Sequence, residues 1–417
     1  MFCNVIILYI FYRKEEAILK NAAIVCEYNP FHLGHKYQID KLKEEGAECI
    51  ICVMSGNFTQ RGEAAIADKY TRAYSALLCG AEIVLELPFP YSSLSAEGFA
   101  RAGAYIADAT LADTLCFGSE CGDIDKLQEA ARTFSCCEFR EAFSSVQKTS
   151  NSSARAYFEA YKKVSGRSEE FSSNDLLGIS YIRAINDLGL DISPRAIKRV
   201  GSSYTDKEIS SMPSAMAIRD LLYRGDIDSC RVTMPTEAFE VLSRAVKNGE
   251  TASYRDKFFE HIHSFFRLCT PDEISARALS LCGGERILDE GEGILQRICA
   301  CAKRCTSNEE FYSSLFNSRY TNTRIQRVIL YSLLGVSDLY RNKLPSYTLL
   351  LGASKTGCEY LSKIRKTQKI NIVTKPSDIP ENVDGILSRR ADALFTLLTG
   401  QVKESGYFLK KSPVILI

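Results

Sequence analysis

The amino-acid sequence predicts an α/β fold, in which a Rossmann-like parallel sheet is followed by a mostly helical, basic C-terminal region. From residue 22 onward, short β-rich apolar runs alternate with longer helical stretches. Strands and helices that alternate at this spacing form parallel sheets with helices on both faces. Beyond residue 235 the apolar residues recur mostly at helical spacing. Residues 311–417 contain 16 Lys and Arg but only 7 Asp and Glu, which makes this region basic.

The elements of the predicted sheet follow one another in the first 230 residues. Strands are expected at residues 22–28, 49–55, 83–87, 114–117 and 195–200, and helices at 34–45, 67–79, 93–108, 175–186 and 211–224. Residues 144–153, SSVQKTSNSS, have the composition of an exposed loop. Later in the chain we expect a helix over 323–334 and a mixture of strand and helix in the last part. The predicted units are an extension (1–20), an α/β domain (21–235) and a mostly helical C-terminal region (236–417).

Composition and cysteine usage narrow the class of protein. The chain has 417 residues, of which 46% are hydrophobic and 25% charged, so a disordered or fibrous protein is excluded. Its 16 cysteines are scattered, many of them inside apolar runs such as residues 49–52, which predicts reduced thiols and a cytoplasmic location. Cys49 with Cys52, and Cys299 with Cys301 and Cys305, lack the partners of a zinc site. We interpret them as buried small side chains and predict no metal ligands in the protein.

The first twelve residues form an apolar run followed by Arg13 and Lys14. This run is shorter than the roughly 20 residues that span a bilayer, and no cleavage signal accompanies it. We therefore predict no stable membrane association and expect residues 1–20 to lie outside the fold, as an over-extended start of the chain would.

The strongest chemical signal directly follows the first strand. Two of the four histidines lie there in the sequence EYNPFHLGH, as His32-x-Gly34-His35. Gly34 lets backbone approach a ligand, and the helix that follows points its free N–H groups at any bound phosphate. Two imidazoles there can donate hydrogen bonds to phosphate and stabilise the charge that develops at an α-phosphorus during in-line displacement. The alternative is a pair of helix-start histidines with structural hydrogen bonds.

This motif resembles the HxGH signature of the adenylyl-transferring α/β nucleotidyltransferases, and the fuller match is to the bacterial tRNA(Met) cytidine acetate ligases. The similarity continues in residues 53–63, 68–72, 80–88, 117–120, 197–201 and 319–327, and it covers nearly the whole chain from about residue 22. The resemblance implies an HxGH nucleotidyltransferase domain over 21–235 and a tRNA-binding region over 236–417. Members of the family begin close to the first strand, which supports residues 1–20 being additional.

The resemblance also implies a reaction in two steps. Acetate attacks the α-phosphate of ATP to give acetyl-adenylate and pyrophosphate, and the wobble cytidine of elongator tRNA(Met) then takes the acetyl group on N4. His32 and His35 would be the catalytic phosphate ligands. The implied ATP-binding residues are Val25, Cys26, Glu27, Tyr28, Asn29, Pro30, Phe31, His32, Leu33, Gly34, His35, Lys36, Tyr37, Gln38, Gly118, Asn174, Arg199 and Val200.

Three of these later positions have plain structural alternatives. Gly118 follows a strand and lets backbone approach a base or ribose, but it also suits a simple turn. Arg199 can pair with phosphates as a planar fork, or form a surface ion pair. Asn174 precedes a helical run and is also a good N-cap residue. Leu33 stands where relatives commonly have Asn, and we expect the change to have a small consequence.

Arg61, Ser214 and Arg219 are further candidate phosphate contacts. Gln60 to Glu63 form a loop at the same sheet edge, which suggests a mobile lid that carries Arg61 to the triphosphate, although an ordinary loop fits equally well. Ser214 and Arg219 resemble a second phosphate motif at a helix N-terminus, where Met216 replaces the small polar residue of the relatives. Mg²⁺ is expected from the chemistry and would be held mainly by ATP, because no carboxylate cage is visible.

Two basic clusters are candidates for tRNA binding. One consists of Arg319, Tyr320, Arg324 and Arg327, and the other of Lys363, Arg365 and Lys366 with Lys369. Arg and Lys neutralise phosphates and Tyr can stack on a base, which is typical of an RNA-binding face. Either cluster alone also fits a solvated helix face.

Two other functions share part of these features. The first is a small-molecule adenylyltransferase of cofactor biosynthesis, of the pantetheine-phosphate or nicotinamide mononucleotide type, but such enzymes are typically much shorter. The second is an RNA-binding protein with a decayed nucleotide site, against which the intact His32, Gly34 and His35 argue.

Overall fold

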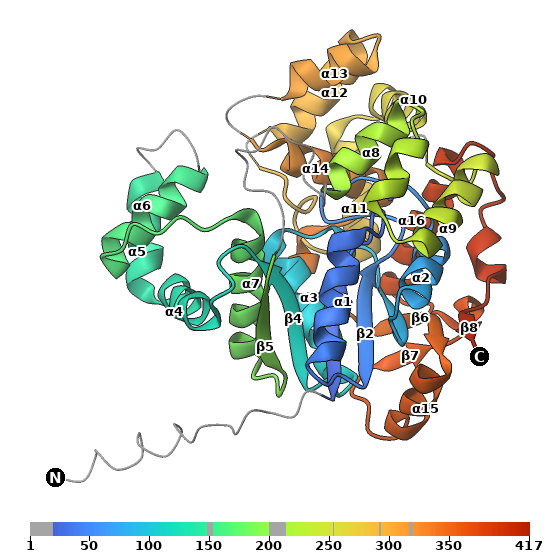
Figure 1. The fold of residues 1–417 in the computed structure, drawn as a ribbon. Helices are drawn as coiled ribbons and strands as arrows, with labels where there is room; N and C mark the ends of the chain where they lie inside the picture. Colours follow the sequence, from blue (N-terminus) through green and yellow to red (C-terminus); the bar gives the residue numbers. More distant parts are fainter. Residues whose placement is uncertain (1–19, 148–152, 200–213, 253, 292, 317–319) are drawn as a thin grey trace.

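The computed structural model describes residues 20–147, 153–199, 214–252, 254–291, 293–316 and 320–417 (Figure 1). Residues 1–19, most of the predicted N-terminal extension, lie outside the described residues. One eight-stranded sheet has the order β5-β4-β1-β2-β3-β6-β7, and β8 pairs with β6. The strands are β1 (Asn21–Cys26), β2 (Cys49–Ser55), β3 (Ile83–Leu87), β4 (Thr114–Ser119), β5 (Ser193–Lys198), β6 (Tyr347–Ser354), β7 (Asn371–Val373) and β8 (Val414–Leu416).

Strands β1 to β5 are parallel, as the alternation of strands and helices predicts. Both faces of this part of the sheet are covered, so β2 and β3 are buried along their whole length and consist mostly of apolar residues. In Figure 1, α1 lies in front of the sheet, whereas α3 and α7 pack together behind it. The fold class predicted from the sequence is therefore confirmed.

Sixteen α-helices are assigned within the described residues. They are α1 (Leu33–Glu44), α2 (Lys69–Leu78), α3 (Ala96–Ala109), α4 (Ile124–Ser135), α5 (Cys137–Gln147), α6 (Ser153–Ser165), α7 (Ser173–Leu188), α8 (Ala215–Tyr223), α9 (Thr236–Lys247), α10 (Tyr254–Leu268), α11 (Pro271–Cys282), α12 (Ile294–Arg304), α13 (Asn308–Leu315), α14 (Asn322–Leu334), α15 (Lys355–Ile364) and α16 (Val383–Leu398). The loop predicted over 144–153 is wrong at both ends, because α5 continues to Gln147 and α6 begins at Ser153.

The C-terminal region is not separate from the sheet. Strand β6 pairs antiparallel with β3, and β7 and β8 pair with β6. A buried ion cluster also joins the two parts: Lys69 Nζ on α2 lies 2.9 Å from Glu86 on β3 and 2.8 Å from Asp392 on α16. Breaking such a buried cluster on one side leaves an uncompensated charge, so it ties the two parts together. The boundary near residue 235 stays a prediction.

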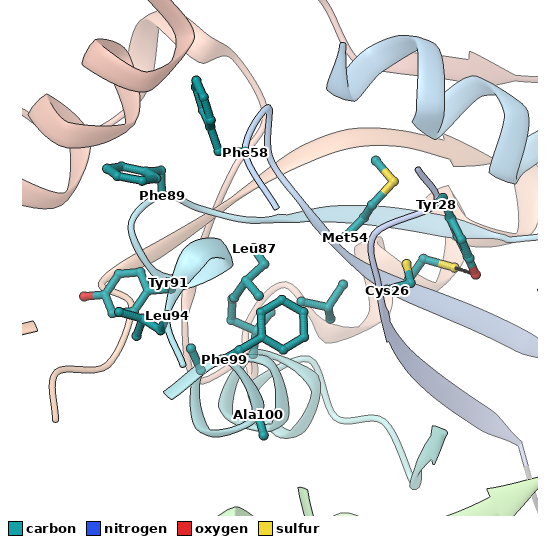
Figure 2. Close-up of a cluster of buried hydrophobic side chains, with 14 of the residues drawn as sticks. Cys26, Tyr28, Met54, Phe58, Leu87, Phe89, Tyr91, Leu94, Phe99 and Ala100 are labelled. Atoms are coloured by element: carbon teal, nitrogen blue, oxygen red, sulfur yellow. Dashed lines mark hydrogen bonds between the residues drawn. The ribbon is translucent and has the colours of Figure 1, made fainter. Parts of the chain in front are cut away.

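An apolar cluster supports the edge of the sheet where β1, β2 and β3 end (Figure 2). It brings together side chains such as Met54 on β2, Phe89 in the loop after β3, and Phe99 on α3. Tyr28 belongs to the same buried set, although the backbone there has a positive φ of 45°. The turn that follows β1 therefore rests on a packed base, which fixes the positions of the residues above it.

The fifteen cysteines among the described residues are free, and nine of them are buried, including Cys49, Cys52 and the set at 299, 301 and 305. For the two sets considered as zinc ligands, Cys49 with Cys52 and Cys299 with Cys301 and Cys305, the interpretation as buried small side chains is confirmed. In the described part of the chain, no cluster of three or more His, Cys, Asp or Glu side chains is arranged to hold a metal ion. None of the helices described combines the length and the apolar character that crossing a membrane requires.

Candidate active site

A cavity of about 530 Å³ opens at the carboxyl edge of the parallel strands. Parallel α/β sheets bind ligands at this edge, where loops and helix N-termini meet. The cavity is lined by the end of β1 and the turn that follows it, by α1, by Phe117 and Gly118 on β4, and by the start of α7. It lies within the volume range of small-molecule sites.

The turn between β1 and α1 holds the two histidines by their own backbone. His32 is the N-cap of α1, and its Nδ1 accepts a hydrogen bond from the Gly34 N–H at 3.0 Å. His35 Nδ1 accepts from the His32 N–H at 3.2 Å. Because a backbone N–H can only donate, both Nδ1 atoms are unprotonated and each neutral ring carries its proton on Nε2. Both rings thus present an Nε2–H donor.

Gly34 is required by this arrangement. A Cβ atom at residue 34 would lie 2.9 Å from Cε1 of the His32 ring, closer than Cβ contacts allow. The sequence interpretation assigned Gly34 to backbone approach toward a ligand. The structure adds that Gly34 makes room for the imidazole of His32.

Burial sets the charge of the histidine pair. The two rings stack with centroids 3.7 Å apart. Burial and the positive charge of Arg199 lower the pKa of His32 to about 4. Burial, the neighbouring His32 and Arg199 hold the pKa of His35 well below its usual range. At neutral pH the pair therefore acts as two uncharged hydrogen-bond donors.

About half of the ATP-binding residues predicted from the sequence line this cavity. They are Val25, Cys26, Glu27, Tyr28, Asn29, His35, Gln38, Gly118, Asn174 and Arg199. The other predicted residues of the turn and α1, which do not line it, are Pro30, Phe31, His32, Leu33, Gly34, Lys36 and Tyr37. Phe31 packs against Tyr28, and Lys36 pairs with Asp40 along α1. Val200 lies outside the described residues.

Glu120 is a site residue that sequence reasoning missed. Its Oε1 accepts a hydrogen bond from Asn174 Nδ2 at 2.7 Å and lies 3.4 Å from Arg199 Nε. It therefore positions two distant residues that line the cavity. Asn174 is not the N-cap of α7, because Ser172 has that role. The block FGSE at 117–120 was the available signal, although only Gly118 was predicted from it.

Gly118 allows the side chain of Arg199 to approach the backbone of β4 closely. A Cβ at this position would lie 3.3 Å from Cγ of Arg199, which is tighter than most contacts. The glycine thus lets the Arg199 side chain lie across the end of β4 beside the cavity.

The loop that carries Arg61 is anchored on both sides. The Gln60 N–H donates to Glu27 Oε1 at 2.8 Å, and Gln326 Nε2 on α14 donates to Glu63 Oε1 at 3.2 Å. A Cβ on Gly62 would lie 2.9 Å from the backbone N of Arg327, so the loop packs directly on α14. Arg61 lines the cavity from this anchored loop, and the lid motion suggested by the sequence stays a prediction.

The two other candidate phosphate contacts, Ser214 and Arg219, do not line this cavity. Ser214 is exposed and caps α8, its Oγ accepting from the Ala217 N–H at 3.3 Å. Arg219 Nη1 donates to the carbonyl oxygen of Asn29 at 2.8 Å, beside the histidine turn. Arg219 and Met216 line a second cavity of about 700 Å³, which also includes Arg61.

The predicted tRNA clusters are separated in space. Strand β6 is antiparallel to β3, so α15 follows at the edge where the parallel strands begin, opposite the cavity (Figure 1). Lys363, Arg365 and Lys366 are exposed at that edge. Helix α14, in contrast, reaches the cavity, which Thr323 lines. Thr323 is a second residue that sequence reasoning missed.

Within the cluster on α14, the structure leaves only part of the predicted basic face. Arg327 is buried and pairs with Asp289 at 2.9 Å, and Tyr320 is also buried, so neither is placed as an exposed RNA contact. Arg324 is partly buried, lies 5.3 Å from the centre of the Tyr320 ring, and donates from Nε to the carbonyl oxygen of Asp289 at 3.0 Å. Arg319 lies outside the described residues.

The fold and the histidine turn define a nucleotidyltransferase, and comparison with known proteins agrees. The family model described as HIGH Nucleotidyl Transferase matches residues 19–407. A tRNA(Met) cytidine acetate ligase of Acetivibrio thermocellus is 33% identical in an alignment of length 395, which covers 90% of this chain and 92% of the relative. The protein of that name from Thermotoga maritima is 35% identical and covers 84% of this chain and 86% of its own length.

Solved structures give the same result. The crystal structure of Thermotoga maritima TmcAL bound with alpha-thio ATP has a TM-score of 0.84 and 31% identity, over 95% of this chain and 99% of that chain. The apo form of the same protein has a TM-score of 0.85 at the same identity and coverage. This chain belongs to the tRNA(Met) cytidine acetate ligase family.

Proposed function

We propose that this protein is an ATP-dependent acetate ligase, which forms acetyl-adenylate and transfers the acetyl group to N4 of the wobble cytidine of elongator tRNA(Met). The observation that carries the proposal is the pair of Nε2–H donors at the carboxyl edge of the sheet, in a chain similar over its length to ligases of that name. We place the reaction in the cytoplasm, where tRNA is modified.

ATP would occupy the cavity with its phosphates toward the histidine turn. The start of α1 offers the positive end of the helix dipole, and its first N–H groups hold the two histidine rings in place. Arg199 and Arg61 line the same cavity and provide positive charge without an adjacent metal-binding cluster. Mg²⁺ would be held mainly by the phosphate oxygens of ATP, since no described group of carboxylates is arranged to bind it, and it would supply charge neutralisation for the leaving pyrophosphate.

In the first step, a carboxylate oxygen of acetate attacks the α-phosphorus. The bond from this phosphorus to the bridging oxygen breaks, and pyrophosphate leaves with the electron pair. Negative charge grows on the oxygens of the α-phosphoryl group, where the Nε2–H of His35 would donate. A neutral donor that is already in place needs no reorganisation during the reaction, which is the condition for electrostatic stabilisation.

In the second step, N4 of cytidine attacks the carbonyl carbon of acetyl-adenylate. The bond between this carbon and the phosphoryl-linked oxygen breaks, AMP leaves with that oxygen, and N4 loses a proton. Neither step uses acetyl-CoA. The tRNA would approach from the side of α14, because this helix reaches the cavity and lies in the basic C-terminal region.

The alternative, a small-molecule adenylyltransferase, leaves unexplained the similarity to tRNA(Met) cytidine acetate ligases, which extends over 90% of this chain. The test incubates the purified full chain with ATP, Mg²⁺ and acetate, with and without bulk bacterial tRNA. Pyrophosphate release and nucleoside mass analysis are the readouts, and acetyl-CoA in place of acetate and ATP is the control.

We expect N4-acetylcytidine only when ATP and acetate are both present. Pyrophosphate release that requires phosphopantetheine or nicotinamide mononucleotide instead of acetate would overturn the proposal.

A further inference from the structure

A second cavity, of about 700 Å³, lies next to the ATP cavity and has a different chemistry. Arg61 lines both cavities. Arg219 lines the second cavity and donates from Nη1 to the backbone oxygen of Asn29, which lines the first. The two cavities therefore meet at Arg61 and at the contact between Arg219 and Asn29. A molecule in the second cavity would lie beside the phosphates of a nucleotide in the first.

Four segments that are far apart in the sequence build this second cavity. Glu63 comes from the anchored loop, Tyr223 from α8, Tyr312 from α13, and Gln326 from α14. Tyr312 is half-buried and lies with its ring centre 5.3 Å from that of Phe316, which also lines the cavity. Aromatic side chains of this kind are the surfaces on which single nucleobases stack in RNA-binding proteins.

The charges suit a polyphosphate less well than those of the first cavity. The carboxylates of Glu63, Asp220 and Glu309 line the second cavity and outnumber its two arginines, Arg61 and Arg219. A carboxylate accepts well from an exocyclic amino group, and this contact is a usual way for Asp and Glu to recognise cytosine. Glu63 is held for this role, because Gln326 Nε2 donates to its Oε1 at 3.2 Å and its loop packs on α14.

We propose that the second cavity is the acceptor subsite, in which the wobble cytidine, turned out of its stack, places its N4 amino group on the Glu63 carboxylate and its ring against Tyr312. This inference rests on the proposed function. Base-modifying enzymes usually extract their target base into such a pocket. Glu63 lines the second cavity together with Arg61, which also lines the first, so a base held by Glu63 would lie on the side of the second cavity that adjoins the acetyl-adenylate. When N4 attacks the acetyl carbon and AMP leaves, the proton from N4 passes to the Glu63 carboxylate.

The test measures two rates on each preparation of the full chain. The first is acetate-dependent exchange of pyrophosphate into ATP, and the second is acetyl transfer to an RNA anticodon arm of tRNA(Met). For Glu63→Gln we expect the ratio of transfer to exchange to fall by about 10²-fold, as the loss of a proton acceptor does. The matched control is Glu310→Gln on α13, which removes the same charge from a side chain that accepts from the Thr306 N–H and does not line the cavity. The control should keep the ratio of the unaltered protein.

A second measurement tests the stacking contact by binding rather than by rate. It compares the affinity for the anticodon arm with that for the same RNA lacking the wobble base. We expect the unaltered protein to prefer the complete arm by about tenfold, Tyr312→Ala to lose most of this preference, and Tyr312→Phe to keep it. Exchange activity shows that each variant is folded.

The outcomes separate this inference from the proposed function. If the unaltered protein makes no N4-acetylcytidine, the proposed function fails. If it does, but Glu63→Gln and Tyr312→Ala keep the normal ratio and the normal base preference, the acceptor subsite lies elsewhere and this inference is overturned.

Discussion

The first cavity, proposed to bind ATP, and the second cavity, proposed as the acceptor subsite and called the acceptor cavity below, share Arg61 but differ in how they are built. The first is organised by one contiguous turn, residues 25–38, whose own backbone fixes the two histidine rings. The second is assembled from a loop near residue 63 and from three helices that begin at residues 215, 308 and 322. A local turn imposes its geometry wherever it occurs, whereas an assembled cavity depends on how the C-terminal helices dock on the sheet.

The two cavities also differ in charge, which suits two successive steps. The ATP cavity combines the neutral imidazole of His35 with Arg199 and Arg61, and the acceptor cavity adds the carboxylates of Glu63 and Glu309. In the proposed arrangement, the phosphates and the amino group would lie next to each other, each beside Arg61. Changes in the first cavity should affect adenylation, and changes near the second should affect only transfer to RNA.

The largest effect is expected for His35→Ala. Loss of its Nε2–H donor should lower acetate-dependent pyrophosphate exchange by about 10²-fold or more, as removal of an oxyanion donor does. Circular dichroism would show that the fold is kept. Near-normal exchange by the folded variant would show that the histidine turn does not carry the chemistry.

The pH dependence of stability tests the environment of the same turn. The pKa of His32 is about 4 in the folded chain and has the usual histidine value of about 6.5 in the unfolded chain. As the pH falls from 6.5 to 4, the unfolded chain therefore binds a proton at this residue and the folded chain does not. The contribution, roughly 3 kcal/mol, is present above pH 6.5 and is lost toward pH 4.

Denaturant unfolding of the unliganded protein across this range measures the loss. His32→Asn keeps an N-cap acceptor but has no titratable ring, so its free energy of unfolding should fall less between pH 6.5 and 4. Equal losses in both proteins would mean that His32 is not held neutral.

A smaller effect is expected for Arg199→Ala. The loss of one charge-assisted hydrogen bond to phosphate should raise the KM for ATP by about tenfold, with little change in kcat. Arg195→Ala is the matched control. Arg195 lies on β5, which ends one residue before Arg199, and it also forms an ion pair, with Glu45 at 2.7 Å, but it does not line the cavity. Equal KM values for the two variants would remove Arg199 from the site.

The smallest effects concern the RNA. Arg324→Ala, beside the cavity, should weaken tRNA binding by about fivefold and lower the salt slope of the affinity by about one. The triple variant Lys363→Ala, Arg365→Ala, Lys366→Ala changes the opposite sheet edge and should have a smaller effect, less than about twofold at physiological salt. A slope lowered by about three in the triple variant would move the RNA face to α15.

The sequence could predict those features that depend on residues close to one another along the chain. The alternating strands and helices, and the turn at EYNPFHLGH, are local patterns, and the parallel sheet they predict is confirmed. The binding roles of the individual residues stay predictions. Partners in buried ion pairs could not be predicted. In the sequence, Arg327 looks like part of a basic surface, but in the folded chain it is buried and paired with Asp289.

Long-range docking explains the other differences. The loop at Arg61 looks like a free lid in the sequence, because its contacts with Glu27 and with Gln326 join segments 33 and more than 260 residues away. For the same reason, the separation of α15 from the cavity follows only from the antiparallel pairing of β6 with β3.

In the proposed reaction, acetate is activated as acetyl-adenylate before cytidine takes the acetyl group. The most direct measurement uses acetate labelled with ¹⁸O in both oxygens, together with ATP and tRNA, and determines the mass of the AMP produced. The account predicts one ¹⁸O atom in each AMP, because an acetate oxygen stays on the phosphorus when N4 displaces AMP. AMP without ¹⁸O, formed together with N4-acetylcytidine, would contradict it.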